Sequence, residues 1–285
     1  MKKKTGIRKV LLVIFCLFFT VYGYGFGVSP AVVCLSGVEV GEDKDTGLDY
    51  TISNDAEKEQ EYTLEVLSPI MPSDESLKGY SPLPDLTWIY LERTTVVVPG
   101  KSTGKSRIHI KIPKDDKYYN QHWAVSCHIK QKGNSFVTAA VAPFLMIETK
   151  SKESIFGNPY GEFGIVPSII GIDLKDLKTK KVSLKIYNNS VKDCTYKISS
   201  FIPDAKTKNA KIGPSDNFEW INEAKWVKPE AANLKIKKGE NKEVEITITL
   251  PDDFKIPAGL KGLEALIFIE AENKEKRFIR VLLVK

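Results

Sequence analysis

The chain has 285 residues, with 42 Lys and Arg against 36 Asp and Glu, and a formal net charge of +6. With 42 % hydrophobic residues, 27 % charged residues and four cysteines, its composition excludes a disordered chain, a collagen and a small disulfide-dense protein. The length suits one large domain or two of ordinary size. A basic excess is the first sign of a nucleic-acid-binding protein, so the position of the charge along the chain matters.

The first residues predict an export signal. A compact basic group is followed by residues 10–22, VLLVIFCLFFTVY, which carry no charge. This apolar run has the length of a signal-peptide core and is shorter than the roughly 20 residues that span a bilayer. Small residues follow it, and cleavage is expected after Gly25 or Gly27. We therefore predict a signal peptide over 1–25, with a retained N-terminal anchor helix as the alternative.

Removal of the predicted signal changes the interpretation of the charge. Residues 1–25 hold five basic residues and no acidic ones, so 37 basic and 36 acidic residues remain. A chain so close to neutrality lacks the field that gives nucleic-acid binding its affinity. We expect an exported protein, periplasmic or extracellular, without nucleic acid as a partner and without a stable transmembrane anchor after cleavage.

Short strands separated by turn residues fill the remaining chain. Strict alternation of apolar and polar residues, as in Ile108, Ile110 and Ile112, is typical of a strand with one buried face. About seven such runs before residue 150 predict an all-β, immunoglobulin-like antiparallel β-sandwich. The runs are 31–40, 48–54, 62–68, 94–100, 107–113, 123–130 and 136–148.

The second half of the chain repeats this plan. Trp88 precedes Pro113 by 25 positions, and Trp226 precedes Pro251 by the same 25. A common offset of 134 residues relates Asn54 to Asn188 and Tyr62 to Tyr196. Matches in register over this length predict two tandem sandwiches, over 26–150 and 151–285.

Several residues have structural roles in this prediction. Asn54 and Asn188 each end a strand, and we expect their side chains to close a turn by bonding the nearby backbone. Trp88 and Trp226 are expected to fill the core between the sheets. The long polar loops 69–87 and 203–219 are either spacers or recognition surfaces.

Groups that carry chemistry are sparse. His109, His122 and His128 are expected to be ordinary surface or core histidines, since no hydrolase or phosphate-loop motif accompanies them. Asp115 and Asp116, and their counterparts Asp252 and Asp253, follow strand ends, where turn capping is favoured over calcium binding. We predict a protein that is not an enzyme and has no catalytic, cofactor or metal site.

Export would place the cysteines in an oxidising compartment. Cys34 and Cys127 fall in the first predicted sandwich and could bridge two strands, with buried free thiols as the alternative. Cys194 then stays unpaired.

The most apolar predicted strand lies last in the first sandwich. Exposed edge strands bind extended partners by adding a strand, so this run is a candidate partner-binding edge. Its alternative is a buried final strand. The candidate residues are Val137, Ala139, Val141, Phe144 and Met146.

Two segments resemble a known group of proteins. GVSPAVVCLSGVEVGE at 27–42 and TWIYLERTTVVVPGKSTGKSRIHIKIP at 87–113, with the strand ending at Asn54 between them, are similar to bacterial exported tandem immunoglobulin-like proteins. These are of the pilus-chaperone-like and WxL-interacting-protein type. The resemblance implies the sandwich fold and a protein partner. Pilus chaperones hold the partner's C-terminal carboxylate with an Arg in the first strand, and residues 28–40 contain neither Arg nor Lys.

Three functions follow from the sequence. The preferred prediction is an exported binding or structural protein of the cell envelope that recognises another protein or a surface polymer through loops or edge strands. A periplasmic pilus-type assembly chaperone acting by strand addition at 137–148 is the second. A carbohydrate-binding or enzyme-accessory module is the third, and it requires exposed aromatic side chains at Tyr118, Tyr119 and Trp123.

Overall fold

The computed structural model describes residues 25–69, 77, 79–133, 140–155, 157–174, 179–203, 212–251 and 254–285. Nearly all of these residues lie in strands and turns, and the helical turns among them are the short 3-10 segments η2 (Leu86–Trp88), η3 (Asp116–Tyr118) and η4 (Ala224–Trp226). The predicted signal peptide lies outside the described residues except for Gly25. No helix in the described part is long and apolar enough to cross a membrane.

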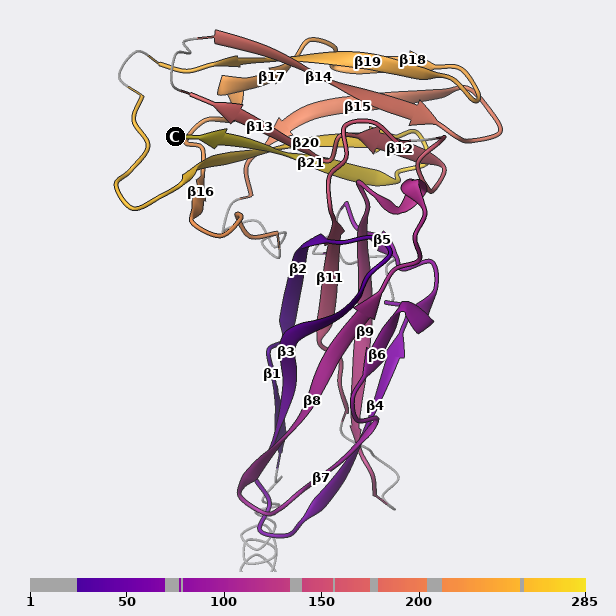
Figure 1. The fold of residues 1–285 in the computed structure, drawn as a ribbon, viewed down its shortest axis with the longest axis vertical. Coiled ribbons are helices and arrows are strands. Elements are labelled where there is room, and N and C mark those ends of the chain that lie inside the picture. The colour runs from indigo at the N-terminus through magenta and orange to yellow at the C-terminus, as the bar shows by residue number, and fades with distance from the viewer. Residues whose placement is uncertain are drawn as a thin grey trace, which may run out of the picture.

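The first sandwich consists of two sheets (Figure 1). The four-stranded sheet has the order β1 (Phe26–Ser29), β3 (Asp43–Asn54), β8 (Ser102–Lys111), β6 (Ile89–Leu91). The other sheet has the order β2 (Val32–Val38), β11 (Phe144–Thr149), β9 (His122–Gln131), β4 (Gln60–Leu67), β7 (Thr95–Val98), and both β10 (Ala140–Val141) and β5 (Ser81–Pro82) pair with β9.

The second sandwich repeats this topology, except that one continuous strand takes the place of β10 and β11. One sheet has the order β12 (Phe163–Val166), β14 (Thr179–Asn188), β19 (Asn241–Thr249), β17 (Val227–Pro229). The other has the order β13 (Ile169–Asp173), β21 (Lys276–Val284), β20 (Gly262–Ala271), β15 (Cys194–Phe201), β18 (Asn233–Ile236), with β16 (Phe218–Trp220) beside β20. The predicted all-β fold of two tandem sandwiches is confirmed. The division at residue 150 stays a prediction.

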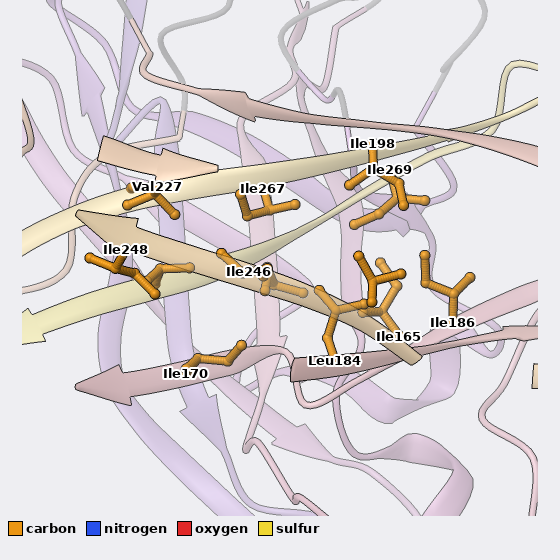
Figure 2. Close-up of a cluster of buried hydrophobic side chains, with 14 of the residues drawn as sticks. Ile165, Ile170, Leu184, Ile186, Ile198, Val227, Ile246, Ile248, Ile267 and Ile269 are labelled. Atoms are coloured by element: carbon orange, nitrogen blue, oxygen red, sulfur yellow. The ribbon is translucent and has the colours of Figure 1, made fainter. Parts of the chain in front are cut away.

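Each sandwich encloses its own apolar core. The alternating isoleucines of β8 and the residue after it, Ile108, Ile110 and Ile112, are at most 1 % exposed. Ile246 and Ile248, at the equivalent positions of the second sandwich, lie in the core drawn in Figure 2. Because a strand turns alternate side chains to opposite faces, these residues give each sheet one apolar face that must be covered by the other sheet.

Asn54 and Asn188 close equivalent turns, as predicted. The Asn54 amide donates to the carbonyl oxygens of Lys58 (2.9 Å) and Val98 (3.0 Å), and its Oδ1 accepts from the Ala56 backbone N–H (3.0 Å). Asn188 makes the corresponding bonds to Lys192 O (2.9 Å), Ile236 O (3.1 Å) and Ser190 N (3.1 Å). Both side chains are buried, so each satisfies backbone groups that water does not reach.

The expected core tryptophans have different degrees of burial. Trp88 is 7 % exposed and belongs to the first core, as predicted. Trp226 is half-buried and packs against the edge of the second core.

The second sandwich lies across one end of the first (Figure 1). A separate apolar cluster joins them. The first sandwich contributes Tyr80, Ala124 and Met146, and the second contributes Leu266, Phe268 and Phe278. These side chains lie on the outer faces of two sheets, which explains why neither sandwich core includes them.

Candidate functional site

Among the described residues, the short strand β10, which precedes β11, is paired on one side only. Ala140 and Val141 of β10 pair with Lys130 and Ile129 of β9. On the opposite side, β2 pairs with β11 from Val32 and Phe144 onward. The residues before β2 belong to β1, which pairs with β3 in the other sheet. Within the described residues, nothing covers this side of β10.

The direction of the backbone groups follows from the bonds on either side. On one side, Cys127 N of β9 donates to Pro143 O (2.9 Å). On the other side, Phe144 N donates to Ala31 O (3.0 Å), which precedes β2. Bonding sides alternate along an antiparallel ladder, so Val141 turns its backbone groups to β9 while Ala140 and Ala142 turn theirs to the open side. Ala140 and Ala142 are exposed and carry small apolar side chains. This edge can therefore accept an added strand.

The equivalent stretch of the second sandwich is covered. There β13 pairs with β21 from Ile169 and Arg280 onward, so residues 276–279 correspond to the open part of the first sandwich. Phe278 stacks on His122 of the first sandwich, with ring centroids 4.1 Å apart. The Arg277 guanidinium donates to Gln121 Oε1 (2.9 Å). One repeat thus uses this position for the contact between sandwiches, and the other leaves it open.

The predicted partner-binding edge is narrower than its sequence pattern indicated. Val141 lies in β10, as an edge prediction requires. Phe144 and Met146 lie in β11, which is paired with β2 on one side and β9 on the other, so their backbone cannot accept a further strand. Met146 is also fully buried between the sandwiches. Val137 and Ala139 lie outside the described residues.

Of the two alternatives for Cys34 and Cys127, a bridge or free thiols, the structure has free thiols. Cys34 pairs with Met146, whose side chain points toward the second sandwich, and the Cys34 Sγ lies 3.6 Å from Glu148 Oε1. Cys127 lies in the core of the first sandwich. The two side chains therefore project from opposite faces of one sheet, which prevents a disulfide. Cys194 is also free, as the sequence predicted.

The aromatic row required by the carbohydrate-binding alternative does not exist. Trp123 is fully buried in the first core, and Tyr118 and Tyr119 are half-buried against it. Trp123 and Tyr118 instead pack edge to face, 6.0 Å apart. β9 turns Trp123 into the core of the first sandwich. The sequence pattern alone does not indicate which face of this strand carries Trp123.

The histidines and aspartates occupy separate places. His109 stacks on the exposed Tyr90 ring (4.7 Å), His122 lies between the sandwiches, and His128 is half-buried on β9. Asp115 caps η3 by accepting from Lys117 N (3.1 Å), as predicted, while Asp252 and Asp253 lie outside the described residues. In the part of the chain that the structure describes, no three His, Cys, Asp or Glu side chains are placed to hold a metal ion.

A buried ionic network that the sequence did not reveal holds the two sandwiches together. Arg280 of β21 donates to both carboxylate oxygens of Glu148 on β11, at 2.7 and 2.6 Å. It also pairs with Glu264 of β20. Tyr80 OH donates to Glu148 Oε1 (2.5 Å). All four side chains are at most 4 % exposed, so each charge depends on these partners.

The ionic network shifts the acid-base behaviour of its carboxylate. Burial alone would raise the pKa of Glu148, but the charge and hydrogen bonds of Arg280 bring it down to about 2. Glu148 therefore stays ionised and holds Arg280 in place. A glutamate ending the apolar run FLMIE was the available sequence signal, but its partner lies 132 residues away.

Comparison with known proteins finds similarity among solved structures. No family model matches the chain, and no curated protein matches it. One similar structure is a protein of unknown function from Porphyromonas gingivalis W83, with 12 % identity over 91 % of this chain and 99 % of that chain and a TM-score of 0.34.

Two further similar structures are described as chaperones. The class 5 fimbriae chaperone CfaA is 12 % identical over 92 % of this chain and 100 % of that chain, with a TM-score of 0.33. The E. coli chaperone DraB is 12 % identical over 92 % and 97 %, with a TM-score of 0.32. At these identities and TM-scores the likeness concerns the fold alone.

Proposed function

We propose that the protein is an assembly chaperone of the cell envelope that binds an extended segment of a partner protein at the open edge of β10. The observation that carries this proposal is the unpaired side of Ala140 and Ala142 at the end of an otherwise covered strand. An added strand would bond to their backbone N–H and C=O groups and continue the sheet. The proposed activity is binding, and it requires no catalytic group.

The side chains around this edge favour a polypeptide partner. Ala140, Val141 and Ala142 are small and uncharged, so they leave a neighbouring backbone free to approach. A surface polymer without regularly spaced amides would not satisfy these backbone groups. A sugar-binding surface would need Trp123 to be exposed, and this side chain is buried.

The position of this edge separates it from the junction between the sandwiches. β10 pairs with Ile129 and Lys130, at the opposite end of β9 from His122, which contacts Phe278 of the second sandwich. A partner strand added to β10 would therefore lie away from the second sandwich. Export to the cell envelope, predicted from the basic and apolar N-terminus, would bring the protein to partners that assemble there.

Site-directed cross-linking tests this proposal. A photo-reactive amino acid at Ala142, introduced in the native host, is expected to capture an exported protein, which mass spectrometry identifies. Changing Ala140→Pro removes an outward N–H without breaking a bond to β9, and should lower recovery of that partner by about tenfold or more.

Ala140→Ser is the matched control, because it keeps the N–H and adds a small side chain. Its recovery of the partner should equal that of the unmodified protein. Equal recovery with Ala140→Pro, at an unchanged circular dichroism spectrum, would show that the edge of β10 does not bind the partner. Cross-links to copies of the same chain alone would also contradict the chaperone proposal.

A further inference from the structure

A groove of about 380 Å³ opens on the side of the second sandwich, between β13 and β14. It lies where the chain leaves one sheet at Val166 and enters the other at Ile169. Its volume falls in the range of ligand sites, about 300–1,000 Å³. The lining residues that matter here are Ile169, Ile170, Gly171, Val182, Ser183 and Leu184.

One wall of the groove is a strand edge on which no strand of the described residues pairs. β14 pairs with β19 from Thr179 to Tyr187, but with β12 only over 185–188. Asn188 N donates to Glu240 O (2.9 Å) toward β19, and Asn189 N donates to Glu162 O (2.8 Å) toward β12. By the alternation of an antiparallel ladder, Ser183 turns its backbone N–H and C=O groups into the groove, and Lys181 turns its own to the same side of β14.

The opposite wall offers a second edge. Arg280 N donates to Ser168 O, and Leu174 N donates to Val284 O, so the even-numbered residues of β13 bond to β21. Ile169 and Gly171 therefore face away from β21. The Ser151 hydroxyl bonds both the N–H (3.2 Å) and the C=O (3.5 Å) of Ile169. Gly171 has neither a side chain nor a described partner to cover its backbone groups.

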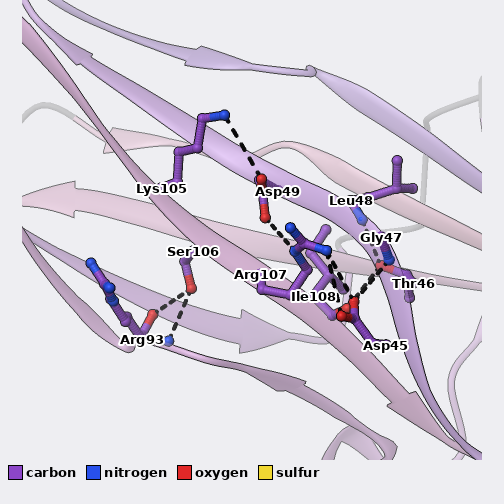
Figure 3. A network of polar contacts seen from close by, with 10 residues as sticks. All are labelled: Asp45, Thr46, Gly47, Leu48, Asp49, Arg93, Lys105, Ser106, Arg107 and Ile108. Atoms are coloured by element: carbon purple, nitrogen blue, oxygen red, sulfur yellow. Dashed lines mark hydrogen bonds and ion pairs between the residues drawn. The ribbon is translucent and has the colours of Figure 1, made fainter.

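The corresponding edge of the first sandwich, on β3, is protected against the addition of a strand, whereas the edge of β14 is open. The pairing of β3 with β8 shifts register between Asp45 and Asp49, and Gly47 at the bulge has a φ of +74°. Arg107 binds both aspartates across the bulge (Figure 3). Bulges and charges of this kind block the addition of a strand. The register of β14 with β19 is unbroken over nine residues.

We propose that this groove binds an extended segment of a partner protein, with an apolar side chain directed at the half-buried Val182. The occupant is assigned from the backbone groups on the two walls, because an extended polypeptide carries N–H and C=O groups at the spacing that they require. Lys185 and Glu153, the charged side chains of the lining, have opposite signs, so the groove is neutral overall. This site is independent of the edge of β10.

A synthetic peptide tests the proposal on the purified protein. The probe is fluorescein-labelled Lys-Val-Thr-Val-Thr-Val-Glu, and its binding is measured by fluorescence anisotropy. We expect saturable binding that is lost when the peptide amides are N-methylated. The variant Ser183→Pro should weaken binding about tenfold or more, because it removes an N–H that points into the groove. Ser183→Ala, the matched control, keeps that N–H and should bind as the unmodified protein does.

Amide hydrogen exchange locates the bound peptide even if Ser183→Pro fails to fold. In the unmodified protein, bound peptide should slow exchange at Lys181, Ser183 and Gly171. Protection confined to Ala140 and Ala142 would overturn this inference and leave the proposed function standing. An absence of binding at millimolar peptide, or equal binding by a folded Ser183→Pro variant, would also overturn it. Protection at both edges would support both proposals.

Discussion

Asn54 shows how one side chain can close a loop of the sandwich. Its amide donates to carbonyl oxygens of the turn and of the strand end at Val98, and its carbonyl oxygen accepts from Ala56. The side chain is 2 % exposed, so a carbonyl deprived of this donor has no water to replace it. A buried polar group left unpaired costs about 1–3 kcal/mol.

We therefore expect Asn54→Ala to lower the free energy of unfolding by about 2 kcal/mol, measured by urea denaturation. Asn273→Ala is the matched control, because the Asn273 side chain donates to Glu162 and accepts from the Glu275 backbone N–H at an exposed position. Water can replace both bonds there, so the loss should cost at most about 0.5 kcal/mol. Equal losses in the two variants would mean that the buried hydrogen bonds of Asn54 contribute no more to the free energy of unfolding than exposed ones do.

Residues with local partners were predictable, and residues with distant partners were not. Asn54 was recognisable because its acceptors lie in its own turn and at a strand end of the same repeat. Glu148 was not, because Arg280 is brought beside it only when two sandwiches meet. For Cys34 and Cys127 the sequence left a bridge and free thiols as alternatives, because it gives the alternation within each strand but not which face of the sheet two strands share.

At the scale of elements, β1 belongs to the folded sandwich. Phe26 pairs with Asn54 and its ring lies 5.0 Å from that of Tyr62. Of the two expected cleavage positions, the one after Gly25 leaves β1 whole, whereas the one after Gly27 would remove Phe26. Preservation of β1 therefore favours Gly25 over Gly27 as the position of the predicted cleavage.

A chain that begins at Pro30 should unfold with a free energy about 3 kcal/mol lower than a chain that begins at Phe26, because it lacks β1 and the packing of Phe26 on Tyr62. Urea denaturation of the two purified chains measures the difference. A chain that begins at Gly25 should match the one that begins at Phe26. Equal stability of the Pro30 chain would show that β1 is dispensable.

The strand pattern was predicted more accurately than its interruptions. The repeat and the alternating isoleucines predicted two tandem sandwiches, because apolar periodicity follows from burial. The run 136–148 was expected as one strand, yet the structure separates β10 from β11 at Ala142 and Pro143. Pro143 turns toward Cys127 and has no N–H to donate, so the ladder weakens there. Which side of β10 is covered depends on where β2 begins, and no local pattern gives that position.

At the scale of the whole molecule, the contact between the sandwiches is sensitive to pH. His122 lies on the first sandwich, stacked on Phe278 of the second, with Glu148, Arg280 and Arg277 around it. Burial lowers the pKa of His122 to about 4, against the attraction of Glu148. The unfolded chain binds this proton near its ordinary pKa of about 6.5. Stability is therefore fully present above that value and is lost as pH falls toward 4.

We expect the free energy of unfolding to fall by about 2 kcal/mol between pH 7.5 and pH 5 through His122. In the variant His122→Gln, which does not titrate, the decrease over this range should be smaller by that amount. Urea denaturation at both pH values measures it. Identical pH dependence in the two proteins would show that His122 is not held neutral between the sandwiches.

The ionic bond between Glu148 and Arg280 also sets an order in time. Glu148 precedes its counter-ion by 132 residues, so it leaves the ribosome, and crosses any membrane N-terminus first, long before Arg280 follows. Until then, burying Glu148 would strand a charge away from water. The first sandwich can close its own core during this interval, but the face that carries Glu148 stays hydrated. Docking of the sandwiches therefore proceeds only once the second sandwich presents its arginine.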